Sequence, residues 1–103
     1  NSQVRALCHA LLDNGRGVDV YDPLLDGDVI SEMGLHPVTD PFVSDLTYDA
    51  VILAVGHSEF RSRSFKDFLG LLDASEKPGV LIDIGRNFSP TSDQTDNVLY
   101  WSI

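Results

Sequence analysis

The stretch Ala50-Val51-Ile52-Leu53-Ala54-Val55 is a continuous apolar run that ends at Gly56. Apolar runs without polar alternation are typical of strands that are covered on both faces of a parallel sheet. The run at residues 80–84, Val-Leu-Ile-Asp-Ile, has the same character, and residues 18–21 and 98–103 are further strand candidates. The sequence therefore predicts a sheet whose main strands are buried.

Two segments between these strands have the periodicity of helices. Residues 2–12 repeat apolar side chains at helical spacing, with Ser2 as a cap and Asn14-Gly15 as the stop signal. Ser64 and Asp67 have the spacing of a capping box at the start of a second helix. The apolar stripe of that helix consists of Phe65, Phe68, Leu69 and Leu72.

The segment between residues 24 and 47 has weaker signals. Asp28 is positioned to cap a short helix that Gly34 closes. Asp40-Pro41 then predicts a further short helix that runs through Leu46, because proline is favoured in the first turn of a helix.

Helices that alternate with apolar strands indicate an α/β protein. We predict a Rossmann-like three-layer sandwich with a mostly parallel sheet, formed by residues 1–103 as a single domain. A helix opens the chain, whereas in doubly wound folds the first helix follows a central strand. We therefore expect the fold to lack its first strand, so that strands 18–21 and 51–55 either pair with each other or receive a strand from elsewhere.

Charge and composition exclude several classes of protein. The chain has 103 residues and a formal net charge of −9, from 16 acidic and seven basic side chains, which argues against nucleic-acid binding. No apolar run approaches the ~18–20 residues that cross a bilayer. Cys8 is the one cysteine, so no internal disulfide can form and we expect a cytoplasmic protein. The excess of Asp over Lys also suits a high-salt cytoplasm, because salt screens the repulsion between like charges. This hypothesis predicts that the melting temperature falls when salt is removed.

Two catalytic or metal-binding hypotheses fail on spacing. Ser58 follows His57, but neighbouring residues on one loop point apart, and the glycines of a nucleophile elbow are absent. Cys8 and His9 diverge by about 100° on a helix and cannot share a metal ion. His36 and His57 have no ligand spacing, and Cys8 is expected to be a small core residue.

Two further binding classes lack their defining residues. A phospho-acceptor domain needs an Asp after its third strand and a Lys after its fifth, whereas Gly56-His57 and Gly85-Arg86 stand at the corresponding strand ends. A dinucleotide site needs Gly-x-Gly-x-x-Gly between a strand and a helix. Gly15-Arg16-Gly17 follows a helix instead, so we interpret it as a helix C-cap and turn and expect no NAD binding by this chain alone.

Ligands of doubly wound folds bind at the carboxyl ends of the strands. Arg86 follows the strand at residues 80–84, and its planar guanidinium suits phosphate or ribose oxygens. The alternative is a surface Arg paired with one of the many Asp side chains. Asp83 is expected to orient Arg86 or to be a simple strand-end acid, and Asn87 flanks Arg86.

Three segments together resemble one enzyme family. Residues 18–23 are similar to its strand and turn that end in Tyr-Asp-Pro, and residues 49–61 are similar to its DAVVLAV-x-H-x-EF segment. Residues 80–87 resemble its D-x-RN strand end, although Asp83 stands three residues before Arg86 where the usual spacing is two. The chain resembles the C-terminal, nucleotide-sugar-binding domain of the UDP-glucose/GDP-mannose dehydrogenases.

The resemblance implies that this chain is part of a larger enzyme. Family members oxidise C6 of a nucleotide-linked sugar from alcohol to carboxylate, using two NAD and a thioester on a Cys in a GFGGSC segment. This chain has no such segment, and Cys8 does not match it. The resemblance therefore implies that NAD is bound by a domain absent from this chain and that the chain alone is not catalytic.

The resemblance also implies roles at the strand end. Arg86 would contact the ribose or phosphate of UDP, with Asp83 and Asn87 as neighbouring substrate-binding residues. The loop at residues 57–60 favours a UDP-N-acetylhexosamine (UDP-ManNAc or UDP-GlcNAc) over UDP-glucose. Expected partners are the UDP-sugar, the rest of the dehydrogenase chain and further copies in a homo-oligomer. The alternative is a stand-alone α/β nucleotide-binding or interaction module that shares only the fold.

Overall fold

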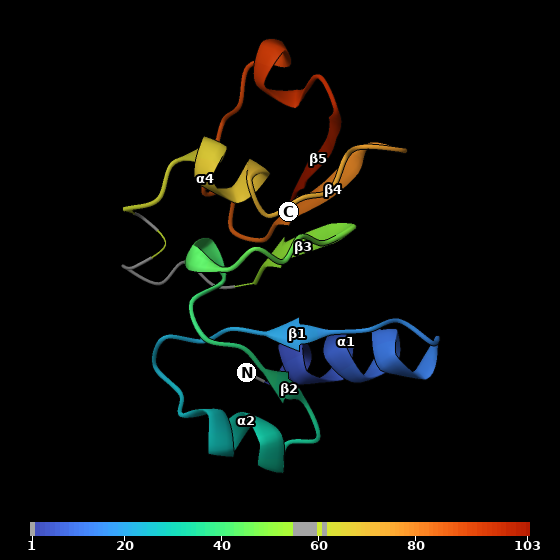
Figure 1. The fold of residues 1–103 in the computed structure, drawn as a ribbon, viewed down its shortest axis with the longest axis vertical. Helices are drawn as coiled ribbons and strands as arrows, with labels where there is room; N and C mark the ends of the chain where they lie inside the picture. Colours follow the sequence, from blue (N-terminus) through green and yellow to red (C-terminus); the bar gives the residue numbers. More distant parts are fainter. Residues whose placement is uncertain (1, 55–59, 61) are drawn as a thin grey trace. The chain divides into compact units, whose positions relative to one another are not determined.

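The computed structural model describes residues 2–54, 60 and 62–103. The chain divides into two compact units, Asn1–Pro41 and Phe42–Ile103 (Figure 1). Strand pairing is parallel in both, and helices connect or flank the strands, which confirms the predicted Rossmann-like α/β class. No described helix is both long and apolar enough to cross a membrane.

The first unit begins with helix α1, Ser2–Asp13, which ends where the sequence predicts. Gly15 has a φ of +79°, and its N–H donates to the Leu12 carbonyl at 3.0 Å. The next N–H, that of Arg16, donates to the Leu11 carbonyl at 3.1 Å. These two bonds form a Schellman motif, for which glycine is favoured because it has no Cβ to clash.

The strands of the first unit are β1, Asp19–Val20, and β2, His36–Pro37, joined by helix α2, Gly27–Glu32. The predicted cap of α2 was wrong, because Asp26 is the N-cap and Asp28 lies in the first turn. Strand β2 was not predicted, since two residues that include a proline have no periodicity to detect. The core of this unit consists of Cys8, Ile30 and Leu35.

A short 3-10 helix, η1 (Pro41–Val43), replaces the helix that was predicted to run through Leu46. The N–H of Leu46 donates to the Ser44 hydroxyl oxygen at 3.1 Å. A local side-chain bond of this kind competes with the backbone bonds that would continue a helix.

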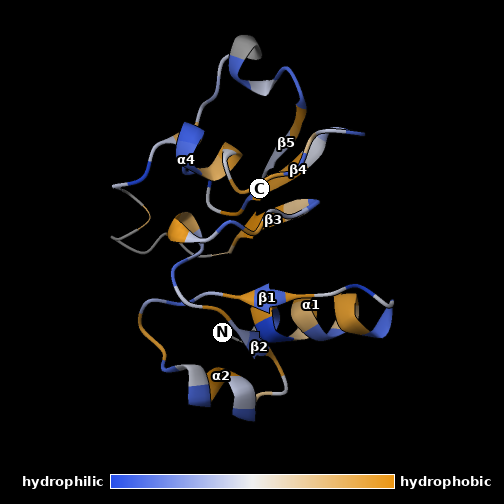
Figure 2. Ribbon diagram, in the orientation of Figure 1, coloured by the Kyte–Doolittle hydropathy of each residue, from blue (hydrophilic) through white to orange (hydrophobic). Residues whose placement is uncertain are grey.

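The second unit contains a three-stranded parallel sheet in the order β3-β4-β5. Its strands are β3 (Ala50–Leu53), β4 (Gly79–Asp83) and β5 (Val98–Ser102), and they run as predicted apart from one or two terminal residues. The predicted polar stretch before β5 contains a 3-10 helix, η2 (Ser92–Thr95). Apolar residues dominate β3 and β4 (Figure 2), and β4 is the inner strand of this sheet.

Helix α4, Phe65–Leu69, supplies the apolar cover of this sheet. Its predicted capping box is confirmed: Ser64 N–H donates to Asp67 Oδ2 at 2.9 Å, and Asp67 N–H donates to Ser64 Oγ at 3.2 Å. The core of the unit consists of Leu53, Phe65, Phe68, Leu71, Leu72 and Leu81.

Strand β1 pairs with β2 in the first unit, and β3 pairs with β4 in the second. The pairing of strands 18–21 and 51–55 with each other stays a prediction. A strand supplied to both from elsewhere, and the treatment of residues 1–103 as one domain, stay predictions.

Candidate functional site

The carboxyl end of β4 is occupied by a fully buried carboxylate, Asp83, whose side chain has 0% exposure. Asn87 Nδ2 donates to its Oδ1 at 2.7 Å, and the Phe88 N–H donates to its Oδ2 at 2.9 Å. The Tyr100 hydroxyl donates to the same Oδ2 at 2.5 Å. Three donors, from the following turn and from β5, thus compensate for the loss of water around this charge.

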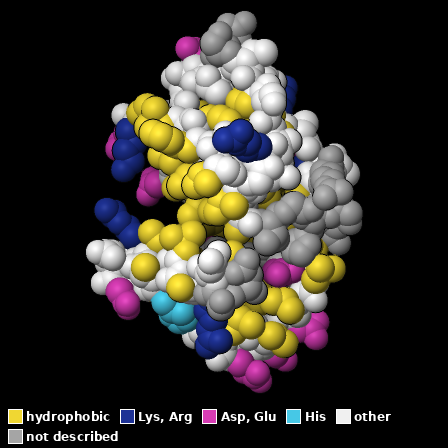
Figure 3. All heavy atoms as spheres, turned by 180° about the vertical axis from the view of Figure 1, so that it is seen from behind, with side chains coloured by type: hydrophobic (Ala, Val, Ile, Leu, Met, Phe, Trp, Pro, Cys, Tyr) yellow, Lys and Arg dark blue, Asp and Glu magenta, His cyan; other side chains and the backbone are white. Residues whose placement is uncertain are grey.

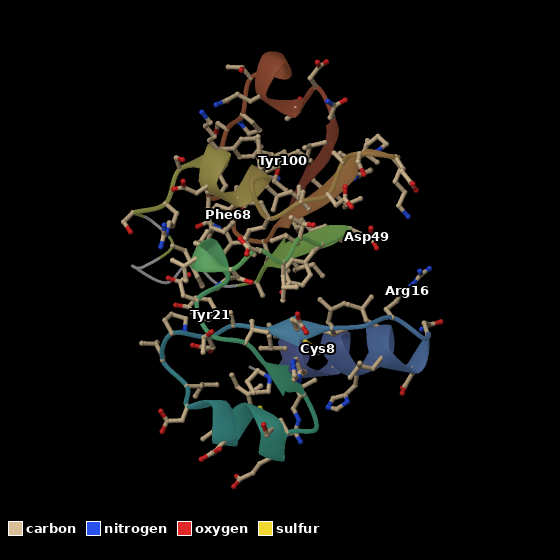
Figure 4. The ribbon with its side chains drawn as sticks, viewed as in Figure 1. Cys8, Arg16, Tyr21, Asp49, Phe68 and Tyr100 are labelled. Carbon is tan, nitrogen blue, oxygen red and sulfur yellow. The ribbon has the colours of Figure 1, made fainter. Side chains whose placement is uncertain are left out.

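Strand register explains why these groups meet. Leu81 lies opposite Tyr100 in the parallel β4–β5 pair, and Asp83 is two residues further along β4, on the same face of the sheet as Leu81. Figure 4 labels Tyr100 and Phe68 in the side-chain cluster of this unit. The Phe65 ring contacts both Tyr100 and Phe88, with ring centroids 5.7 Å and 5.5 Å apart. The polar contacts of Asp83 are therefore continuous with the aromatic core.

The pKa values of Asp83 and Tyr100 differ from their ordinary values, and for Asp83 burial and hydrogen bonding act in opposite directions. Burial alone would raise the pKa of Asp83, but the hydrogen bonds from Tyr100, Asn87 and Phe88 together lower it below its ordinary value. Burial and the neighbouring Asp83 carboxylate raise the pKa of Tyr100 to about 12. At neutral pH the pair is therefore a carboxylate that accepts from a neutral phenol.

The turn after β4 has an unusual backbone. Gly85 has a φ of +99° and Arg86 a φ of +53°, and Arg86 is the one non-glycine residue with positive φ in the described chain. The left-handed conformation costs a residue with a Cβ roughly 1–2 kcal/mol. Asn87 Nδ2 also donates to the Ile84 carbonyl at 3.2 Å, and Gly85 N–H donates to the Ile103 carbonyl at 2.9 Å. These bonds hold the turn at both ends.

The structure places the three predicted site residues on this one strand end. Arg86 is exposed, Asn87 is exposed at the following position, and Asp83 is buried beneath them. The donors to the Asp83 carboxylate are Asn87, Phe88 and Tyr100, and whether Asp83 orients Arg86 or is a simple strand-end acid stays a prediction. Among the described residues, Arg86 forms no ion pair, so the alternative of an Asp-paired surface Arg is not observed there.

Tyr100 is the member of this cluster that the sequence analysis missed. A signal was available, because a buried carboxylate needs hydrogen-bond donors. Tyr100 carries such a donor, and it lies with Val98 on the face of β5 that packs against the core.

Two other strand ends are candidates for ligand binding, residues 21–23 and 56–59. In the first, Asp22 Oδ1 accepts from the Leu24 N–H at 2.8 Å, and the second lies outside the described residues, as does Arg61.

The described residues do not form a metal site or a dinucleotide site. No group of three or more His, Cys, Asp or Glu side chains in the described part of the chain could hold a metal ion. Cys8 is a buried core residue, and burial raises the pKa of its thiol. Gly15 is the C′ residue of α1, as predicted, so the Gly15–Gly17 turn is at the wrong end of a helix to fit the phosphates of NAD.

Comparisons with known proteins agree with this geometry. The UDP-N-acetyl-D-glucosamine 6-dehydrogenase of Salmonella typhi is 39% identical over 54 residues, which are 52% of this chain and 12% of that protein. The enzyme of the same name from Pseudomonas aeruginosa is 40% identical over 63 residues, 60% of this chain and 14% of that protein. No solved structure is significantly similar. Residues 1–90, from α1 through the turn that carries Arg86, match the UDP-glucose/GDP-mannose dehydrogenase family, UDP binding domain, and the chain belongs to this family.

Proposed function

We propose that this chain is the UDP-binding part of a larger NAD-dependent UDP-sugar 6-dehydrogenase. The family match supports a UDP-binding role, and the names of the two relatives favour UDP-N-acetylglucosamine as the sugar nucleotide. UDP-N-acetylmannosamine and UDP-glucose are the competing substrates. The reaction would convert the C6 alcohol into a carboxylate, with NAD held by parts of the enzyme other than this chain.

The exposed guanidinium of Arg86 is the observation that supports this proposal most directly. It stands at the carboxyl end of the central strand β4, where ligands of doubly wound folds bind. In a chain of net charge −9, an Arg that no described acid neutralises is suited to a diphosphate. We assign Arg86 to a phosphate or ribose oxygen of UDP.

Asn87 has a second role in the proposed site. Its amide nitrogen donates to Asp83 and to the Ile84 carbonyl, which leaves the side-chain oxygen as an acceptor for a ribose hydroxyl. Asp83 has no exposed surface, so its contribution to binding is to hold Asn87 rather than to contact the nucleotide. The remaining contacts with the sugar belong to other parts of a cytoplasmic, homo-oligomeric enzyme.

The test is the activity of the full-length gene product that contains residues 1–103. We expect NADH to form with UDP-N-acetylglucosamine faster than with UDP-N-acetylmannosamine or UDP-glucose. Arg86→Ala should raise the KM for the nucleotide sugar and leave the KM for NAD unchanged. A protein that reduces no NAD with any of the three substrates would overturn the proposal and favour a stand-alone binding module.

A further inference from the structure

The strained turn at Arg86 needs support from outside itself. A positive φ at a residue with a Cβ persists only where the surrounding contacts determine the conformation more strongly than the strain opposes it. Bonds from the Asp83 carboxylate reach the two residues that follow Arg86, namely Asn87 at 2.7 Å and Phe88 at 2.9 Å. The Asp83 side chain therefore links the residues that follow Arg86 to the end of β4.

Asp83 is in turn fixed by Tyr100, the donor that does not belong to the turn. Tyr100 comes from β5, and its hydroxyl donates to the same oxygen that accepts from the Phe88 N–H. Its ring packs against Phe65 of α4, which also contacts the Phe88 ring. Tyr100 lies beyond residues 1–90, the part of the chain that matches the family.

The Tyr100 hydroxyl also lies 3.0 Å from the Phe88 carbonyl oxygen, so it contacts the turn directly as well as through Asp83. We propose that Tyr100, through these two contacts, is a positioning residue that holds the Arg86 turn in its ligand-binding conformation and so sets the affinity for a nucleoside diphosphate. This proposal rests on the proposed function, because it assumes that Arg86 contacts the diphosphate. Removing the Tyr100 hydroxyl leaves Asp83 with donors from the turn alone, so the turn is tied less firmly to the sheet. UDP must then order the turn when it binds, which makes the free energy of binding less favourable.

The test is a UDP titration of the full-length protein that contains residues 1–103, with the affinity of each variant compared with that of the unmodified protein. We expect Tyr100→Phe to weaken UDP binding by roughly three- to tenfold, in the lower part of the range of couplings between contacting residues. Tyr48→Phe is the matched control, because it removes a phenolic hydroxyl from a half-buried Tyr of the same unit that is not one of the three donors to Asp83. It should leave the affinity unchanged.

A double-mutant cycle separates positioning from general damage to the fold. In an Arg86→Ala background, Tyr100→Phe should cause a clearly smaller loss of affinity, because the guanidinium that the turn positions is gone and only the contact of Asn87 is still affected. An equal loss in both backgrounds would overturn the proposal. So would equal UDP affinity of Tyr100→Phe and the unmodified chain. If the unmodified full-length protein does not bind UDP at all, the proposed function fails first.

A second measurement requires no variant. The Phe88 amide hydrogen bonds to Asp83 and reports on closure of the turn. If UDP binds the closed turn, hydrogen exchange at Phe88 should slow in the presence of UDP, while exchange at Val38, whose N–H donates to Val20 in the other unit, should not change. Unchanged exchange at Phe88 under saturating UDP would contradict the proposal.

Discussion

Arg86 has a backbone conformation that is unfavourable for any side chain with a Cβ, and its side chain is exposed. Strain of this kind is concentrated at functional positions, because a folded protein gains nothing else from keeping it. A glycine in place of Arg86 would adopt this conformation without strain, because it has no Cβ.

We expect Arg86→Gly to be more stable than Arg86→Ala by about 1 kcal/mol, because the alanine keeps the strained Cβ and the glycine does not. Urea denaturation of the two variants measures this difference. Both variants lack the guanidinium, so both should lose UDP affinity. Equal stability of the two variants would mean that the turn relaxes to negative φ when Arg is removed.

Tyr100 makes the stability of the chain sensitive to alkaline pH. Its pKa is raised from 10.0 to about 12 in the folded chain, so its stabilising bond to Asp83 is complete below pH 10 and is lost as the pH rises toward 12. The free energy of unfolding should fall over this range more steeply in the unmodified chain than in Tyr100→Phe. Parallel pH profiles for the two proteins would contradict the assignment of the raised pKa to Tyr100.

For individual residues, the sequence predicts the positions of the candidate site residues better than it predicts their hydrogen-bond partners. Arg86 and Asn87 stand at the end of an apolar strand, and their place on an exposed turn follows from that pattern. The partner of Asp83 does not follow, because it depends on the register of β4 against β5, where Leu81 lies opposite Tyr100. Register is a tertiary property that local spacing does not determine.

Among the elements, local chemistry predicts the boundaries well. The capping box of Ser64 and Asp67 starts α4, and Gly15 ends α1, because both signals act through backbone groups a few residues away. Between residues 24 and 47 the short helix that Gly34 closes is confirmed as α2, but its cap, strand β2 and the length of η1 were not predicted. Strand β2 exists only through its pairing with β1.

Gly79 at the start of β4 is required by close packing against Leu72. A Cβ at this position would lie 2.9 Å from the Leu72 Cβ, which cannot move away independently of the backbone. Gly79→Ala should therefore destabilise the chain by about 1–3 kcal/mol. Gly17→Ala is the matched control, since a Cβ there meets nothing within 4 Å and should change stability little. Equal urea midpoints for the two variants would contradict this account of the packing.

The whole molecule carries an excess of negative charge. Sixteen acidic side chains face seven basic ones, so the basic side chains are too few to neutralise the acids. On the face drawn in Figure 3, Asp and Glu side chains are scattered over the surface. Self-repulsion of this kind opposes the compact state and weakens as salt screens it.

The melting temperature should accordingly fall when salt is removed. Lowering the ionic strength from 1 M to 0.01 M lengthens the screening distance from about 3 Å to about 30 Å, so repulsion extends across the whole chain. Thermal unfolding at several sodium chloride concentrations measures the effect, with uncharged sucrose as the control for general solvent effects. A melting temperature that is constant or higher at low salt would contradict it.

If UDP binds at the turn that carries Arg86, an amide spectrum of the isotope-labelled protein titrated with UDP should locate the binding there. We predict that millimolar UDP shifts the signals of residues 84–88, that uridine without phosphates shifts them less, and that Arg86→Ala abolishes the difference. Shifts confined to another part of the chain, or no shifts at all, would contradict the account.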